Sequence, residues 1–352
     1  MMVPTALVLA ALLAPSCTAF LLRNRHVVAE QPTRGPLCKE GKLLPELYII
    51  GGKNTGTTSL YTDLALHSGL DAAPNDRTKE WNFWRTWESD HQSSSLSAVA
   101  VRQEKEEWFS ALPKCPAQRK IIGDFSVTNL FLTPMGSDMF HSRDYGFGGM
   151  AEDWDVPLHL KDIYEDLSSN ITIVVILREP LARLQSEWYH TKPLHNCKGC
   201  MSKDTFGEAL PFNIDLARKQ PAEISDWLWK SYYARQLEDW FHYFDPSQFV
   251  IVPMKLYVGE DTELVPQALS RHLDTDLGEW YQASHLNGHF KPPLSKDAKP
   301  KDEAAFRELM EPENERLFRL LTDASLKGAS LVGYDGGAGS ESEVRQWLES
   351  QW

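Results

Sequence analysis

The sequence is short of positive charge: 36 Lys and Arg residues stand against 49 Asp and Glu, and the formal net charge is −13. A general nucleic-acid-binding protein needs a basic footprint, so this balance excludes that class. It also disfavours a long, heavily charged polyanion as the main partner unless a local basic groove exists. The length of 352 residues and the hydrophobic content of 42% predict one large folded domain or two modest ones.

Cysteine is also scarce, with five in the chain. Cys197 and Cys200 form one CxxC pair, and without a second such pair we expect a loop disulfide here and no zinc site. With Cys38 and Cys115 they make an even number beyond the N-terminal segment, which fits an oxidising lumen. The pattern does not determine how the four would pair.

The N-terminal segment predicts export. Val3 to Leu22 carries no charge, and the small residues Cys17 and Ala19 give a cleavage point before Phe20. Residues 1–19 are therefore predicted to be a signal peptide, with a signal anchor as the alternative. Membrane association is expected through this segment only. Ala19-Phe20 and the acid-poor stretch after it also resemble a bipartite plastid presequence, which would direct the chain to a plastid.

Turn residues and apolar runs predict an α/β protein. Residues 20–44 are expected to be an irregular linker, residues 45–335 the folded domain and residues 336–352 a C-terminal tail. Strands alternate with helices, which is typical of a doubly wound, mostly parallel central sheet flanked by helices. The loop at 133–158 is long enough to serve function, and 191–221 is expected to be an insertion. We expect strands at 47–51, 120–124, 171–177 and 249–252, and helices at 57–68, 180–190, 225–244 and 302–321.

The turn after the first strand has the composition of an anion site. Gly51-Gly52-Lys53-Asn54-Thr55-Gly56 leads into Thr57-Thr58-Ser59, where a helix is expected to begin. Backbone N–H groups at a helix start bind phosphate groups. The nucleotide-triphosphatase loop has its lysine directly after the second glycine, whereas here Lys53 reaches the phosphate from inside the loop. The structural alternative is an ordinary strand–helix connection with a hydroxyl cap.

A second polar group follows the most apolar strand. Arg178 comes directly after residues 171–177, at the carboxyl end where ligands of open α/β sheets bind. Ser186 lies about two turns into the helix that Pro180 begins. A surface arginine and an ordinary helical serine are the structural alternative.

Together these two segments resemble the cofactor motifs of sulfotransferases that use 3′-phosphoadenosine-5′-phosphosulfate (PAPS). The first is similar to their 5′-phosphosulfate loop, and the second to their 3′-phosphate motif, Leu-Arg-x-Pro followed by Arg and Ser. The resemblance is nearest to the Golgi carbohydrate enzymes of the heparan sulfate type. It continues through Lys79-Glu80-Trp81-Asn82-Phe83-Trp84, residues 231–240 and 310–317, and the loop 287–292.

The resemblance implies a P-loop-like sulfotransferase fold, PAPS as co-substrate and no metal ion. Lys53 would stabilise the charge on the leaving oxygen, and Glu80 would be the general base towards the acceptor. A solvated glutamate is the alternative for Glu80, with His67, His190 and His285 as fallback bases. The cofactor-binding residues implied are Lys53, Asn54, Thr55, Gly56, Thr57, Thr58, Ser59, Arg178, Ser186, Tyr233 and Lys291.

The implied acceptor is a hydroxyl or amine of a carbohydrate or small molecule, and the implied location is the Golgi lumen. Asn170-Ile171-Thr172 is the one sequon for a glycan there. Asp124-Phe125-Ser126 stands where the heparan enzymes carry Lys-Ser, so the acceptor class stays open. Trp81, Trp84 and Trp87 either stack on sugar rings or form a buried aromatic stripe.

Two other function classes fit parts of this pattern. A P-loop-type nucleotide kinase would share the architecture, but the missing Gly-Lys-[Ser/Thr] order argues against it. A non-catalytic glycan- or nucleotide-binding relative would keep the phosphate motifs without transfer. The two phosphate motifs and a candidate base at Glu80 favour an enzyme.

Overall fold

The computed structural model describes part of the chain, and Arg34–Trp352 makes up one unit of it. The described residues are 34–68, 70–73, 79–83, 98–133, 155–191, 205–219, 225–259, 261, 263–278, 294–336 and 339–352. The predicted signal segment, the CxxC pair and the loop 287–292 with Lys291 lie outside them. Among the described residues, no helix combines the length and the apolar character that crossing a membrane requires.

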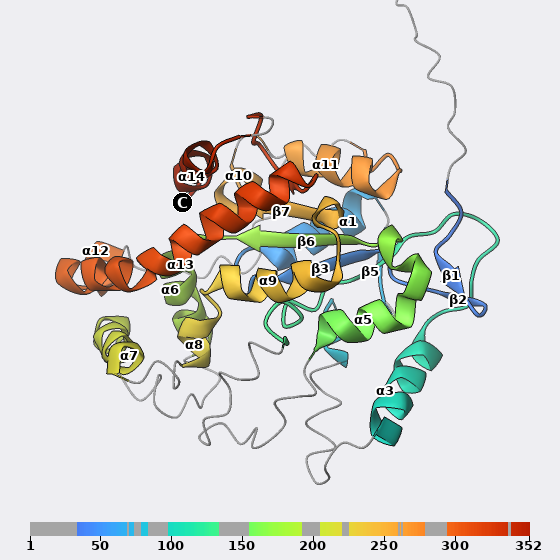
Figure 1. The fold of residues 1–352 in the computed structure, drawn as a ribbon, viewed down its shortest axis with the longest axis horizontal. Helices are drawn as coiled ribbons and strands as arrows, with labels where there is room; N and C mark the ends of the chain where they lie inside the picture. The colour runs from blue at the N-terminus through green and yellow to red at the C-terminus, as the bar shows by residue number, and fades with distance from the viewer. Residues whose placement is uncertain are drawn as a thin grey trace, which may run out of the picture. The chain divides into compact units, whose positions relative to one another are not determined.

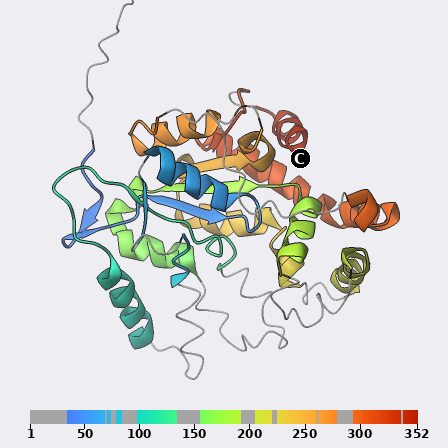
Figure 2. The same cartoon turned by 180° about the vertical axis from the view of Figure 1, so that it is seen from behind.

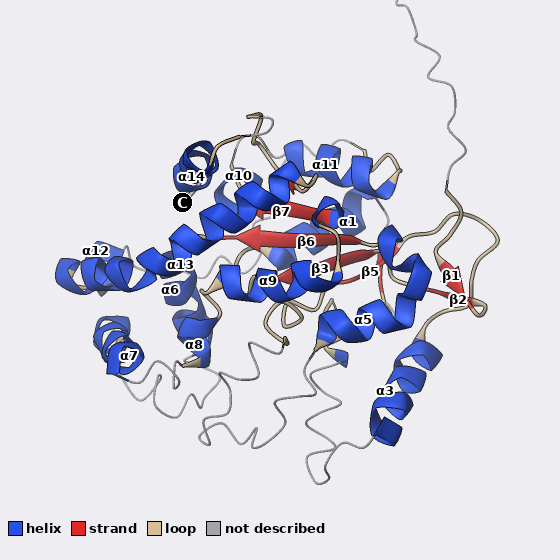
Figure 3. Cartoon of the chain, viewed as in Figure 1, coloured by secondary structure: helices blue, strands red, loops and turns tan. Residues whose placement is uncertain are grey.

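Six parallel strands form the central sheet (Figure 1, Figure 3). Their order is β4-β5-β3-β6-β7-β8, and each neighbouring pair is parallel. This confirms the predicted doubly wound α/β class. The bounds are β3 Leu47–Gly51, β4 Asp71–Ala72, β5 Ile122–Asp124, β6 Thr172–Leu177, β7 Phe249–Pro253 and β8 Ser330–Leu331.

Both faces of the sheet are buried because apolar side chains run along β3, β6 and β7 without interruption. Alternate residues point to opposite faces, so Ile173 and Val175 join one core cluster while Val174 and Ile176 join the other. The first face carries α5 (Val156–Tyr164), α6 (Pro180–Thr191), α9 (Tyr233–Tyr243) and α13 (Pro300–Leu326), and the second carries α1 (Thr57–Ser68), α10 (Met254–Tyr257) and α11 (Leu264–Leu273) (Figures 1 and 2).

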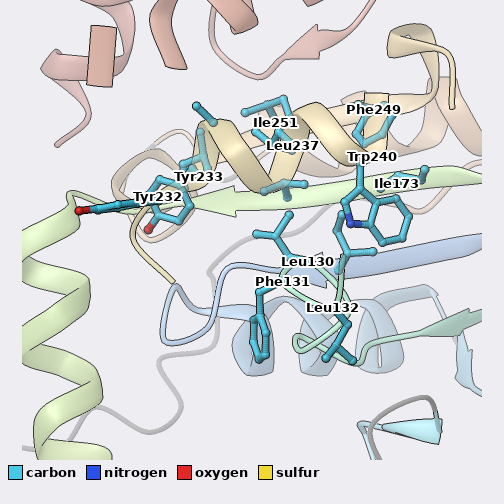
Figure 4. Packing of buried hydrophobic residues seen from close by; sticks show 14 of the residues in the cluster. Leu130, Phe131, Leu132, Ile173, Tyr232, Tyr233, Leu237, Trp240, Phe249 and Ile251 are labelled. Atoms are coloured by element: carbon cyan, nitrogen blue, oxygen red, sulfur yellow. The ribbon is translucent and has the colours of Figure 1, made fainter. Parts of the chain in front are cut away.

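Helix α9 shows how the first face is packed. Leu237 and Trp240 lie against Ile173 of β6 and against Phe249 and Ile251 of β7, while Tyr233 lies near the arrowhead of β6 (Figure 4). Trp229 and Trp240 are fully buried, and Trp227 is 2% exposed. These tryptophans are therefore core residues and do not offer a sugar-stacking surface.

The predicted long helix at 225–244 is wrong, because the structure breaks it. Helix α8 covers Asp226–Trp229 and α9 begins at Tyr233. The buried guanidinium of Arg183 donates to the carbonyl of Trp227 at 2.5 Å and to Ser231 Oγ at 2.8 Å. Side-chain donors thus satisfy polar groups at the break, and tertiary contacts override the helical pattern.

The N-terminal region contains more structure than the sequence predicts. Strands β1 (Cys38–Lys39) and β2 (Lys42–Leu43) form an antiparallel pair where an irregular linker was expected, and Cys38 forms a disulfide with Cys115. Leu43 and Leu44 are buried beside them. At the other end, α14 (Glu341–Ser350) packs Val344 and Leu348 into the first core cluster, so the predicted tail is largely helical.

The remaining helices surround this framework. Helix α3 spans Ala98–Ala111, α7 spans Phe206–Lys219 inside the predicted insertion, and α12 spans Leu294–Asp297. Short 3₁₀ turns at Glu165–Asn170 and Pro246–Gln248 lead directly into β6 and β7. The predicted strand and helix positions around residues 47–68 and 171–191 are confirmed.

Candidate active site

The loop between β3 and α1 lies at the carboxyl edge of the sheet. Gly52 N donates to the carbonyl of Ile176 on β6 at 3.0 Å, and Thr55 Oγ1 donates to the carbonyl of Gly52 at 2.6 Å. Asn54 and Gly56 have φ values of 64° and 95°, a left-handed conformation that glycine adopts most easily. These contacts turn the loop sharply, so that the first turn of α1 starts at Thr57.

The two phosphate motifs meet at this edge. Arg178 Nη1 donates to the carbonyl oxygen of Asn54 at 3.0 Å, and Tyr233 Oη donates to the carbonyl oxygen of Arg178 at 3.0 Å. Burial lowers the pKa of Arg178, and the nearby Arg183 lowers it further. The structure therefore brings together four residues that the sequence analysis chose from three separate segments: Lys53, Asn54, Arg178 and Tyr233.

Helix α6 supplies a buried carboxylate beside this loop. Lys53 Nζ lies 3.5 Å from Glu187 Oε1, which Lys230 Nζ also contacts at 3.0 Å, and Arg183 Nη1 lies 2.5 Å from Oε2. Burial acts to raise the pKa of Glu187, but Lys230, Arg183 and Lys53 together lower it to about 2. Ser186, the neighbouring residue, is 6% exposed. Sequence reasoning missed Glu187 and Lys230.

Glu80 reaches the same site from the other side of the loop. Lys79 Nζ donates to Thr57 Oγ1 at 3.0 Å, to Thr58 Oγ1 at 3.2 Å and to Glu80 Oε1 at 3.0 Å. One ammonium group thus joins the predicted base to the hydroxyls at the start of α1. Burial lowers the pKa of Lys79, which Glu80 partly offsets. Lys79 was not among the predicted site residues, although it stands directly before Glu80.

The loop after β5 holds this segment in place. Asn82 N donates to Ser126 Oγ at 2.8 Å, and Thr128 Oγ1 donates to Asn82 Oδ1 at 3.0 Å. Asp124 is buried, which raises the pKa of its carboxyl, and Oδ1 accepts from Ser126 N at 2.8 Å. Asp124, which stands where the heparan enzymes carry lysine, therefore holds Ser126. Ser126 in turn holds the segment that contains Glu80.

The other residues predicted for the site do not share one location in the structure. His67 lies in the last turn of α1, about 15 Å along the helix from Thr57, and His190 is exposed near the end of α6. Trp81 stacks on Trp108 with ring centroids 5.5 Å apart, which favours the buried aromatic cluster. His285, Lys291, Trp84 and Trp87 lie outside the described residues.

Comparison with known proteins finds sulfotransferases that are similar in sequence to this chain. No protein-family model matches the chain. Carbohydrate sulfotransferase 15 of Homo sapiens is 22% identical over 321 residues, which cover 80% of this chain and 54% of that protein. Bifunctional heparan sulfate N-deacetylase/N-sulfotransferase 1 of Xenopus tropicalis is 23% identical over 222 residues, which cover 63% of this chain and 21% of that protein. The chain is therefore similar in sequence to carbohydrate and heparan sulfate sulfotransferases.

The chain spans about half the length of the first curated relative that it matches. A second heparan enzyme, bifunctional heparan sulfate N-deacetylase/N-sulfotransferase 3 of Homo sapiens, is 25% identical over 214 residues, covering 59% of the chain and 20% of that protein. Among solved structures, a sulfotransferase from Alicyclobacillus acidocaldarius is 18% identical with a TM-score of 0.49, covering 79% of this chain and 96% of that one.

Proposed function

We propose that the chain transfers a sulfuryl group from PAPS to a hydroxyl or amine of a carbohydrate-like acceptor. The observation that carries this proposal is the contact between Arg178 and the Asn54 carbonyl, because it joins the two implied phosphate sites at one edge of the sheet. The curated relatives named carbohydrate and heparan sulfate sulfotransferases support the same chemistry.

The residues present fit an anionic nucleotide. The loop 52–56 turns into the N-terminus of α1, where backbone N–H groups favour anions. Three cationic side chains lie at this turn: Lys53 is part of it, Lys79 donates to Thr57 Oγ1 and Arg178 donates to the Asn54 carbonyl. Thr57 and Thr58 supply hydroxyls for the 5′-phosphate, while Arg178 and Ser186 are assigned to the 3′-phosphate. Lys291 is proposed as a further cofactor contact on the basis of the resemblance alone.

PAPS supplies the activated sulfuryl group when bound. Transfer forms a bond between the acceptor oxygen or nitrogen and sulfur, breaks the bond from sulfur to the bridging oxygen, and leaves adenosine 3′,5′-bisphosphate (PAP). Lys53 stabilises the negative charge that gathers on the bridging oxygen. Glu80 takes the acceptor proton. Lys79 holds Glu80 next to Thr57 and Thr58, so the base and the phosphosulfate loop are fixed relative to each other.

We further propose that the protein works in the lumen of the secretory pathway. The disulfide between Cys38 and Cys115 supports an oxidising compartment, and the prediction of a signal peptide at residues 1–19 agrees with it. Localisation of a tagged full chain in its native cell, with the segment 1–19 intact or deleted, tests this point. Plastid fluorescence in place of a secretory pattern would refute it.

The function itself is tested with radiolabelled PAPS and a panel of neutral, uronate-containing and sulfated glycans. We expect labelled product with at least one glycan, and a loss of about 10²- to 10³-fold in kcat for Lys53→Ala. Lys219→Ala is the matched control, because its ammonium pairs with Asp215 on the exposed face of α7. A Lys53→Ala rate equal to that of the wild type would show that the site is misassigned.

A further inference from the structure

A buried cluster of charges lies directly behind the phosphosulfate loop and is formed by Lys53, Arg183, Glu187 and Lys230. Arg183, Glu187 and Lys230 are 0%, 3% and 5% exposed, whereas the side chain of Lys53 is 28% exposed. All three cations act on one carboxylate, and they lower the pKa of Glu187 to about 2. Lys53 is the member of the cluster whose side chain is partly exposed.

Glu187 has a fixed position within this cluster. Its Oε2 accepts from Arg183 at 2.5 Å, and Arg183 is itself anchored to Ser231 Oγ and to the carbonyl of Trp227. Its Oε1 accepts from Lys230 at 3.0 Å, whose ammonium lies 5.1 Å from the centre of the Phe131 ring. The carboxylate therefore stays in place whichever way the Lys53 side chain turns.

Lys53 and Lys230 share the same carboxylate oxygen, at 3.5 Å and 3.0 Å. The closer partner, Lys230, is almost fully enclosed, so its contact is the more persistent of the two. Lys53 is thus directed by a carboxylate that already has a nearer cation. Glu187 thereby holds the Lys53 ammonium 3.5 Å from its Oε1 atom, and a more strongly charged anion in the site would compete for that ammonium.

We infer that Glu187 is a positioning residue for Lys53, which holds its ammonium in the direction needed for sulfuryl transfer. This inference rests on the proposed function, because it assigns Glu187 a task only where Lys53 acts on a leaving oxygen. Glu187 touches neither the nucleotide nor the acceptor in this assignment. It acts through the lysine, and its own position is set by Arg183 and Lys230.

The Glu187→Gln variant separates positioning from binding. The substitution removes one negative charge next to an anion site, so PAP is expected to bind as tightly as in the wild type or more tightly. Lys53 loses the carboxylate that directs it, and kcat is expected to fall by about 100-fold, as for a misplaced reacting group. Turnover is therefore expected to fall while PAP affinity is kept or rises. If Glu187 merely supported the fold, its substitution would lower PAP affinity and kcat together.

The matched control is Glu46→Gln. Glu46 is fully buried and pairs with Arg119 at 2.7 Å and with Arg34 at 3.5 Å, next to the amino end of β3 and so at the opposite edge of the sheet. Removing its charge is expected to lower thermal stability as Glu187→Gln does, but to leave PAP affinity and kcat unchanged. Glu187→Asp keeps the charge on a shorter side chain, and we expect unchanged PAP affinity with an intermediate kcat.

The experiment measures PAP binding by calorimetry and by the thermal shift of the full chain, together with turnover of labelled PAPS. Turnover is followed with the acceptor found in the glycan panel, or as release of free sulfate to water. Weakened PAP binding in Glu187→Gln alongside the lowered kcat would overturn the inference, as would a kcat equal to that of Glu46→Gln. If Glu187→Gln does not fold, a wild-type kcat in Glu187→Asp overturns it equally. A wild-type chain that does not bind PAP would overturn the proposed function itself.

Discussion

Arg178 and Asn54 lie 124 positions apart in the chain, yet Arg178 Nη1 donates to the Asn54 carbonyl oxygen at 3.0 Å. The contact is possible because β3 and β6 are parallel neighbours, so the segments after them leave the sheet at the same edge. One arginine thereby supports the turn between β3 and α1 through its guanidinium.

Arg178→Ala is expected to weaken PAP binding by about 10- to 100-fold, because a charge-assisted contact worth about 1.5–3 kcal/mol is lost. Arg178→Lys restores the charge without the planar fork, so its affinity should lie between the two. Calorimetry with PAP measures both. Arg218→Ala, which removes an exposed partner of Glu308, is the control, and an Arg178→Ala affinity equal to it would contradict the assignment.

Glu80→Gln is expected to lower kcat by about 10²- to 10⁴-fold, because the acceptor proton loses its base. PAP affinity should stay close to that of the wild type, since Lys79 keeps its contacts with Thr57 and Thr58. Initial rates at saturating PAPS, together with PAP calorimetry, separate the two quantities. Equal losses in binding and turnover would instead mark Glu80 as a structural partner of Lys79.

Gly52→Ala is expected to weaken PAP binding by distorting the phosphosulfate loop. A Cβ atom at Gly52 would lie 3.1 Å from Thr55 Cγ2 and 3.2 Å from Tyr233 Cε1, so the loop or the tyrosine must shift. Gly35→Ala is the control, because a Cβ atom there has no heavy atom within 4 Å. PAP titrations of the two variants should differ by about tenfold or more, as for the loss of about 1.4 kcal/mol. Identical affinities would mean that the close approach of Tyr233 is dispensable.

Stability is expected to depend on pH through Glu187. Its folded pKa of about 2 lies below the ordinary value of 4.5. The contribution of Glu187 to the free energy of unfolding is therefore complete above its pKa in the unfolded chain. It is lost as the pH falls through its pKa in the folded protein. This contribution is about 3 kcal/mol. Urea unfolding of wild type and Glu187→Gln measures it. The gap in unfolding free energy between them should narrow by about 2 kcal/mol from about pH 5 to about pH 3, and a constant gap would show that Glu187 is not the titrating group.

The parts of the site that could be predicted from sequence are those with local signals. The β3–α1 turn follows an apolar strand and is rich in glycine and hydroxyl residues, and the helix begins at Thr57 as expected. Arg178 follows a strand whose unbroken apolar run marks it as central. Each of these segments carries its own strand, turn and helix pattern, so periodicity sufficed.

The contacts of Lys230 and Lys79 could not be predicted from the sequence pattern. Lys230 lies in a segment whose pattern predicts one continuous helix, and the break that brings it to Glu187 depends on Arg183 from another helix. Lys79 contacts Thr57 and Thr58 across 22 and 21 positions. No spacing along the chain encodes either contact.

The sequence by itself determined the α/β class and the position of the two turns that resemble phosphate-binding motifs, because strand and helix periods and glycine-rich turns are local properties of the chain. Only the tertiary structure decided that Glu187 contacts Lys53 and that Lys79 joins Glu80 to α1. Those pairings depend on which buried charges meet when the sheet and helices pack, and a buried charge is tolerated only where a partner from another element is already in place.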